Sequence, residues 1–166
     1  MGVMDDIIHI RIDDRFIHGQ VASFWTNTLQ ATRIMVANDD VAVNDVQKQV
    51  LRLAAPAGVR TSLISVERAA KQILEGRYAG QRVFVVVNSP ADILRLMDLG
   101  LPITKINVGN IGGRSDRTEV KATVHLTPEE AAQFHELLDR GVEVTTQMVP
   151  SEPVTFMRDL LEQKGL

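Results

Sequence analysis

The chain has 166 residues, of which 45% are hydrophobic and 23% charged, and its formal net charge is −3. This composition is that of an ordinary globular domain and excludes disordered, collagen-like and coiled-coil proteins. The strongest apolar run, Val83–Val87, is far shorter than the roughly 20 residues needed to cross a bilayer. Cysteine is absent, which excludes disulfide scaffolds, thiolate metal sites and thiol catalysis.

Charge and aromatic content also argue against nucleic-acid binding. Most nucleic-acid binders carry a basic face, whereas this chain is slightly acidic. One Trp, one Tyr and five Phe are too few for base-stacking platforms. The first ten residues hold two acids and no basic segment, which is unlike a secretory signal peptide. We therefore expect one intracellular domain over residues 1–166, with no nucleic-acid partner.

Strand-like and helix-like segments alternate along the chain. The predicted strands are Ile7–Ile12, Arg33–Ala37, Thr61–Ile64, Arg82–Val87, Lys105–Val108, Val120–Leu126 and Val142–Val149. The predicted helices are Gly19–Leu29, one capped by Asn44, one from Ser65 to Gly76, one from Ser89-Pro90 to Gly100, one from Thr127-Pro128 to Gly141, and Pro153–Gln163. The order predicts an α/β fold, with an open, mostly parallel sheet of about six to seven strands and helices on both faces.

Chemistry-bearing residues concentrate directly after the first strand, where such sheets bind their ligands. His18 follows Asp14 and Arg15 and precedes a predicted helix. At a helix N-terminus, unpaired N–H groups and the positive dipole end keep an imidazole neutral and nucleophilic. The same groups attract an anion, so we predict that His18 carries a phosphoryl group. Surface ion pairs and a helix cap are the alternative for this segment.

Neighbouring residues suit supporting roles. Arg15 or Arg11 could neutralise phosphoryl oxygens with a planar guanidinium. Gly19 and Gln20, at the start of the helix, are the predicted phosphate-binding amides. Asp14 could accept the proton of the His18 ring nitrogen that does not react, which would fix the ring's tautomer and orientation.

The string from Arg11 to Trp25, RIDDRFIHGQVASFW, closely resembles the phosphorylation-site signature of one family. This is the IIB subunits of the mannose/fructose/sorbose family of bacterial phosphoenolpyruvate-dependent sugar phosphotransferase systems. The signature contains D-R-[LF]-[IV]-H-G-Q-V. The resemblance continues through Tyr78–Gly100, Lys105–Gly113 and Arg140–Val144.

This resemblance implies a phosphocarrier enzyme, a protein-N(pi)-phosphohistidine–sugar phosphotransferase. His18 would accept phosphate on Nδ1 from a phosphohistidine of a IIA protein or domain. It would then pass the group to a sugar held by the membrane IIC/IID subunits, with Asp14 and Arg15 as supporting residues. The resemblance further implies an open, largely parallel sheet and a cytoplasmic protein that associates peripherally with the permease. We expect no cofactor, and homo-oligomer formation is left open.

Three further residues are predicted to edge the site because they follow strands. Asn38 follows the second strand, and Gly109 and Asn110 follow the fifth. Helix capping is the alternative for Asn38, and an ordinary turn for the glycine-rich stretch. The string Asn107–Asn110 is similar to that of amino-sugar relatives and favours an N-acetylgalactosamine-type sugar, with mannose, fructose and sorbose as alternatives.

Two apolar residues and the remaining histidines have less specific roles. Phe16 and Ile17 either form an apolar rim for partners or pack inward. The other histidines, His9, His125 and His135, have no ligand-spaced carboxylates. We therefore expect no metal site, and structural or solvated roles for these three rings.

Three alternative functions fit the sequence less well. Asp13 and Asp14 would suit a receiver-like signalling domain, but no acceptor aspartate follows the third strand and no lysine follows the fifth. A nucleotide-binding domain lacks both common glycine-rich phosphate-binding strings. A non-catalytic regulatory paralogue would not need the intact signature around His18.

Overall fold

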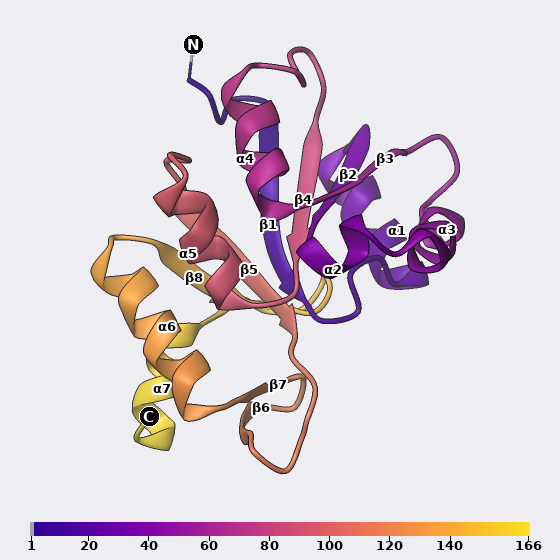
Figure 1. Ribbon diagram of the computed structural model, residues 1–166. Coiled ribbons are helices and arrows are strands. Elements are labelled where there is room, and N and C mark those ends of the chain that lie inside the picture. The colour runs from indigo at the N-terminus through magenta and orange to yellow at the C-terminus, as the bar shows by residue number, and fades with distance from the viewer. Residues whose placement is uncertain (1) are drawn as a thin grey trace.

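The computed structural model describes residues 2–166, in which strands and helices mostly alternate along the chain (Figure 1). The strands are β1 (Ile7–Asp13), β2 (Arg33–Ala37), β3 (Arg60–Ile64), β4 (Val83–Val87), β5 (Lys105–Asn110), β6 (Thr118–Lys121), β7 (Val124–Leu126), β8 (Glu143–Thr146) and β9 (Thr155–Phe156). The helices are α1 (Gly19–Leu29), α2 (Asp39–Ala42), α3 (Asp45–Ala54), α4 (Val66–Leu74), α5 (Pro90–Asp98), α6 (Pro128–Asp139) and α7 (Met157–Lys164).

Seven strands form one sheet in the order β3-β2-β4-β1-β5-β8-β9. All neighbours are parallel except β9, which pairs antiparallel with β8. The predicted fold class is therefore confirmed. β1 lies in the middle, with β4 on one side and β5 on the other. The chain leaves β1 toward β2 and later crosses from β4 to β5, so the strand order reverses at the carboxyl end of β1.

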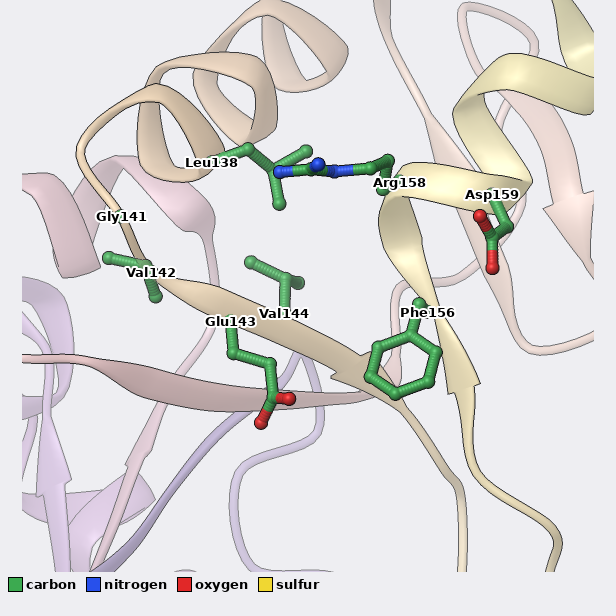
Figure 2. A pocket seen from close by; sticks show the side chains of 8 residues that line it. All are labelled: Leu138, Gly141, Val142, Glu143, Val144, Phe156, Arg158 and Asp159. Atoms are coloured by element: carbon green, nitrogen blue, oxygen red, sulfur yellow. The ribbon is translucent and has the colours of Figure 1, made fainter.

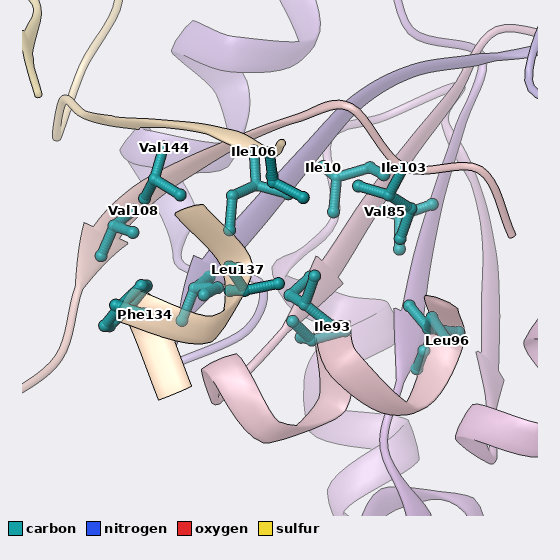
Figure 3. Packing of buried hydrophobic residues seen from close by; sticks show 14 of the residues in the cluster. Ile10, Val85, Ile93, Leu96, Ile103, Ile106, Val108, Phe134, Leu137 and Val144 are labelled. Carbon is teal, nitrogen blue, oxygen red and sulfur yellow. The ribbon is translucent and has the colours of Figure 1, made fainter. Parts of the chain in front are cut away.

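The sheet separates two apolar cores. In β4, Val83, Val85 and Val87 belong to one core, whereas Phe84 and Val86 belong to the other. Figure 3 shows the first core, where α5 and α6 pack on the sheet. The second core contains residues of α1 and α3. Burial on both faces explains why β4 shows no polar alternation.

Helix starts follow the predicted caps in three of four places. The side chains of Asn44, Ser65 and Thr127 each accept a hydrogen bond from a backbone N–H in the first turn of the helix that follows. Thr127 also forms a reciprocal capping box with Glu130. Ser89 precedes Pro90 as predicted but makes no such bond, so the expected hydroxyl cap is absent there.

Three predicted segments differ in the structure. Val120–Leu126 is not one strand, because the chain reverses within it and β6 and β7 pair as a separate antiparallel hairpin. The last long strand ends at Thr146 rather than Val149, and the chain then turns back so that Thr155 pairs with Thr146. The C-terminal helix starts at Met157 rather than Pro153, because Thr155 and Phe156 pair with β8. None of the helices within residues 2–166 has the length and apolar character that a bilayer crossing requires.

Candidate functional site

His18 lies at the reversal point of the strand order, in the loop that joins β1 to α1. It is the N-cap residue of α1, with extended backbone angles (φ −122°, ψ 106°), and its side chain forms no capping hydrogen bond. His18, Gly19 and Gln20 are all exposed, and no acidic residue occupies the first turn of α1. The first N–H groups of the helix thus open onto the surface beside an exposed imidazole, an arrangement that suits an anion.

The two apolar residues before His18 anchor the loop. Phe16 and Ile17 are 9% and 5% exposed and belong to the core beneath α1. Phe16 has φ +60°, a left-handed conformation that is unusual for an aromatic residue. Its N–H donates to the carbonyl of Asp13 at 3.0 Å, which closes the turn. Of the two alternatives for these residues, inward packing is therefore the one that the structure shows, and the side chains hold the loop to the core instead of forming an apolar rim.

Asp13 is a buried carboxylate shared by two arginines. Its side chain is 1% exposed and accepts from Arg11 Nη2 at 3.2 Å. It also accepts from Arg15 Nε at 3.2 Å and Arg15 Nη2 at 3.3 Å. The Arg15 side chain remains 30% exposed. Arg15 is therefore the loop guanidinium that solvent, and hence an external anion, can reach.

Arg11 is enclosed, and its predicted role as a phosphate ligand is wrong. It donates to the carbonyl oxygens of Gln147 and Met148 at 2.9 and 3.0 Å, and its guanidinium lies over the Trp25 ring at 5.3 Å. Burial lowers the pKa of Arg11, and the charge and hydrogen bond of Asp13 oppose that shift. All its described partners are internal, so Arg11 balances charge inside the protein instead of facing a ligand.

Asp14 points toward the β5 loop. Its carboxylate accepts from Asn110 Nδ2 at 2.6 Å and from the Gly112 N–H at 2.8 Å, and its own N–H donates to the Asn110 carbonyl. Within residues 2–166 no hydrogen bond joins Asp14 to His18, so the predicted ring contact is not formed in this structure. The carboxylate is already committed to two donors, and Asp14 instead ties the histidine loop to the end of β5.

The other predicted edge residues have structural partners. The Asn38 side chain caps α2 by accepting from the Val41 N–H at 2.9 Å, which is the capping alternative rather than a site contact. Gly109 lies against the Arg11 guanidinium. Asn110 contacts the histidine loop through its hydrogen bonds with Asp14. The structure therefore places Asn110 near the site, whereas Asn38 caps α2 and Gly109 leaves room for the Arg11 guanidinium.

A cavity of about 330 Å³ lies next to Asp14. Its lining includes Asn88 and Ser89 at the end of β4, together with Arg114 and Arg117 from the glycine-rich stretch. Four parts of the site were not predicted as site residues from the sequence: Asn88, Ser89, Asp13 and the segment around Met148. The position of Asn88 and Ser89 after a buried strand is a signal that could have found them, whereas nothing local marks Met148.

A larger cavity, of about 380 Å³, lies elsewhere (Figure 2). Leu138, Val144 and Phe156 line it, and its floor includes the start of β8. In a parallel sheet that end is opposite to the carboxyl ends of the strands, so this cavity does not belong to the histidine loop.

The remaining histidines have internal or terminal contacts. His9 stacks on Trp25 with ring centroids 4.7 Å apart. Burial, followed by the charges of Arg11 and Lys105, lowers the pKa of His9 from 6.5 to about 4. His125 and His135 contact backbone carbonyls. Within the part of the chain that the structure describes, no group of three or more histidine and carboxylate side chains could hold a metal ion.

Together these features define a class of protein. The fold is a doubly wound α/β sheet, and at its reversal point an exposed histidine opens a helix beside an anchored arginine. Residues 7–166 match the family described as the PTS system sorbose subfamily IIB component. The chain therefore belongs to the IIB components of the mannose/fructose/sorbose family of sugar phosphotransferase systems.

Relatives support this family membership over nearly the whole chain. The fructose-specific EIIB component of Bacillus subtilis is 35% identical over 149 residues, covering 90% of this chain and 91% of the relative. The mannose-specific EIIAB component of Escherichia coli K12 is 37% identical over 153 residues, covering 92% of this chain. The match covers only 47% of that longer relative, so the chain spans about half its length.

Solved structures of related proteins have the same fold. The IIBSor domain of the sorbose permease from Klebsiella pneumoniae has a TM-score of 0.90 at 33% identity, covering 95% of this chain and 97% of that domain. A PTS-dependent N-acetyl-galactosamine IIB component from Streptococcus pyogenes has a TM-score of 0.87 at 27% identity, covering 96% and 99%. The sheet order and the loop described above thus belong to a fold with several solved members.

Proposed function

We propose that this protein is a phosphoryl carrier in which His18 accepts a phosphoryl group from a phosphohistidine of a IIA protein or domain and passes it to a sugar. The observation that carries the proposal is the pairing of an exposed His18 at the α1 N-terminus with the anchored, partly exposed Arg15 in the same loop. An exposed ring is required because the group must move between separate proteins.

In the first step, the lone pair of a His18 ring nitrogen, Nδ1 by family resemblance, attacks phosphorus. The new N–P bond forms as the N–P bond of the donor histidine breaks. The proton on the other His18 nitrogen is released, and the donor imidazole takes up a proton as it leaves. Bond types made and broken are the same, so the protein mainly has to position the groups and stabilise charge.

In the second step, a sugar hydroxyl oxygen attacks phosphorus and the His18 N–P bond breaks. The electron pair returns to the ring, and the hydroxyl proton is transferred to it directly or through solvent. The products are a sugar phosphate and neutral His18. We propose that the sugar is held by membrane IIC/IID subunits, so the carrier works in the cytoplasm and meets the permease peripherally.

Arg15 and the first amides of α1 would hold the transferred group. The guanidinium offers N–H donors to phosphoryl oxygens, and the N–H groups at Gly19 and Gln20 lie at the positive end of the helix dipole. No metal or other cofactor is part of the proposal. The sugar stays a prediction, with the N-acetylgalactosamine type favoured by the string Asn107–Asn110.

The carboxylates of the loop are poor phosphate acceptors in comparison. Asp13 is enclosed between two arginines, and both Asp14 oxygens accept hydrogen bonds from the loop after β5. A receiver-like acyl phosphate would need one of them to leave these partners and reach solvent. This disfavours the signalling alternative.

The test is labelling with phosphoenolpyruvate and the general and IIA components of such a system. We expect acid-labile, base-stable phosphate at His18 that is absent from His18→Ala, and transfer onward to sugar only with permease membranes. Supplying mannose, fructose, sorbose and N-acetylgalactosamine separately would identify the sugar. Base-labile phosphate on Asp13 or Asp14, or unchanged labelling of His18→Ala, would overturn the proposal.

A further inference from the structure

We infer that Asp13 is a positioning residue for phosphoryl transfer, which holds the Arg15 guanidinium in the orientation that the phosphoryl group needs. The inference rests on the proposed function of His18 and adds a role for a residue that would not itself touch the phosphoryl group. It is carried by four hydrogen bonds that converge on one buried carboxylate.

The Asp13 side chain holds Arg15 through both of its oxygens. Asp13 Oδ1 accepts from the backbone N–H of Arg15 at 2.9 Å and from Nε at 3.2 Å, and Oδ2 accepts from Nη2 at 3.3 Å. One edge of the planar guanidinium is thereby fixed, together with the backbone at its base. Nη1 is left on the other edge, where it can donate to an external anion.

Asp13 is itself held from behind by Arg11, whose Nη2 donates to it at 3.2 Å. Arg11 cannot shift easily, because the carbonyls of Gln147 and Met148 accept from it and Gly109 lies against its guanidinium. The segment after β8 is tied in turn, since Glu152 accepts from the Met148 N–H. The orientation of Arg15 is therefore set by residues more than a hundred positions away in the chain.

Charge balance explains why this carboxylate does not cancel Arg15. Asp13 carries one negative charge, while Arg11 and Arg15 carry two positive charges, so the three side chains keep a net charge of +1. With Arg15 alone, a buried Asp13 would cancel the charge of that guanidinium. Arg11 supplies the second charge, which leaves a net attraction for a phosphoryl dianion.

The structure also separates this role from a general need for positive charge. Lysine in place of Arg15 would keep the charge, but its single ammonium cannot hold Asp13 along a planar edge and still present a donor on the opposite edge. Positioning by Asp13 therefore predicts that Arg15→Lys transfers phosphate nearly as slowly as Arg15→Ala. A role for charge alone predicts that it transfers like the unsubstituted protein.

The experiment uses radiolabelled phosphoramidate, a small donor with a P–N bond, and measures the labelling rate per folded molecule. We expect Arg15→Ala and Arg15→Lys to be slower by about a hundredfold, and Asp13→Asn by about tenfold or more. Asp13→Asn should cause no further loss in the Arg15→Ala background, because it acts through Arg15. Asp98→Asn, which breaks the Arg140–Asp98 ion pair at the C-terminal end of α5, is the control and should leave the rate unchanged.

Phosphorus NMR gives a second readout that a purely structural role would not move. The guanidinium contact stabilises the phosphoryl dianion, so losing that contact should raise the titration midpoint in Arg15→Ala and in Asp13→Asn but not in Asp98→Asn. Removing the Asp13 charge while the Arg15 contact persists would instead lower the midpoint, because the net charge of the cluster would rise from +1 to +2. Three outcomes would each overturn the inference. The first is a labelling rate of Arg15→Lys equal to that of the unsubstituted protein, and the second is an equal loss of rate from Asp13→Asn in the presence and absence of Arg15. The third is a phosphoryl titration midpoint that does not rise in Asp13→Asn. If Asp13→Asn does not fold, the labelling rate of Arg15→Lys still tests the inference. Labelling of His18→Ala would instead overturn the proposed function.

Discussion

The guanidinium of Arg11 lies directly against the Cα of Gly109 on the neighbouring strand. A Cβ at position 109 would lie 1.9 Å from Arg11 Nη2, far inside any allowed contact. The residue pairs of β1 and β5 place the two positions on adjacent strands of the sheet centre. Only glycine leaves room for the buried Arg11 guanidinium to pass over β5. Gly109 of the glycine-rich stretch is therefore required by the charge cluster of Arg11, Asp13 and Arg15.

Gly109→Ala is therefore expected to displace Arg11 and break its bonds to Asp13 and the Met148 carbonyl. An unpaired buried charge costs about 3 kcal/mol or more, so the free energy of unfolding should fall by that order. Urea unfolding measures the loss. Gly113→Ala is the control, because its new Cβ would come no closer than 3.4 Å to His125, and it should change stability little. Equal stability of the two variants would contradict the predicted clash.

Asp14→Asn tests whether Asp14 supports the His18 ring or the loop. Each carboxylate oxygen now accepts from one donor, and in the variant an amide NH2 would face either Asn110 or Gly112, so about 1–2 kcal/mol of stability should be lost. The phosphoryl-transfer rate per folded molecule should fall by less than about threefold, because the carboxylate bonds to the β5 loop. A drop as large as that of Arg15→Ala would restore the ring contact that the sequence suggests.

His9 gives the protein a pH-dependent stability that His9→Phe should lack. Burial lowers the pKa of His9 to about 4, so between pH 6.5 and 4 the unfolded chain binds a proton that the folded protein excludes. Stability attributable to neutral His9 is present above this window and is lost as the pH falls through it, by about 3 kcal/mol at most.

Urea unfolding of both proteins from pH 7 to pH 4 provides the measurement. The stability of His9→Phe relative to the unsubstituted protein should rise as the pH falls, while phenylalanine keeps an aromatic ring against Trp25. At pH 7 the variant should be at least as stable, because the buried His9 Nε2 has no hydrogen-bond partner. A difference that does not change with pH would show that His9 titrates normally.

Trp25→Phe should loosen the segment around Met148. The indole Nε1 donates to the Met148 carbonyl at 2.9 Å, and a phenyl ring cannot replace that bond. We expect a loss of about 1 kcal/mol in the free energy of unfolding and faster hydrogen exchange of the N–H groups after β8. Val21→Ala, on the same helix, is the comparison, and it should destabilise without selectively increasing exchange after β8.

Much of the fold could be predicted because its signals are local. The apolar run of β4 and the caps Asn44, Ser65 and Thr127 act within a few residues, so each is visible in a short window of sequence. The hairpin of β6 and β7 and the short strand β9 were harder to predict from the sequence. Their pairing depends on which distant strand edge is available, and the sequence of Val120–Leu126 is equally compatible with one continuous strand.

By itself, the sequence determined the α/β order of elements, the family signature and the position of His18 at the start of a helix, because all three are written in contiguous residues. Only the tertiary structure decided which charges support it. Arg11 and Arg15 look equivalent in the string, but Arg11 is buried by carbonyls more than 130 residues away while Arg15 reaches solvent. Burial and hydrogen bonding are properties of the packed chain, and they separate an internal cation from one that a phosphoryl group can meet.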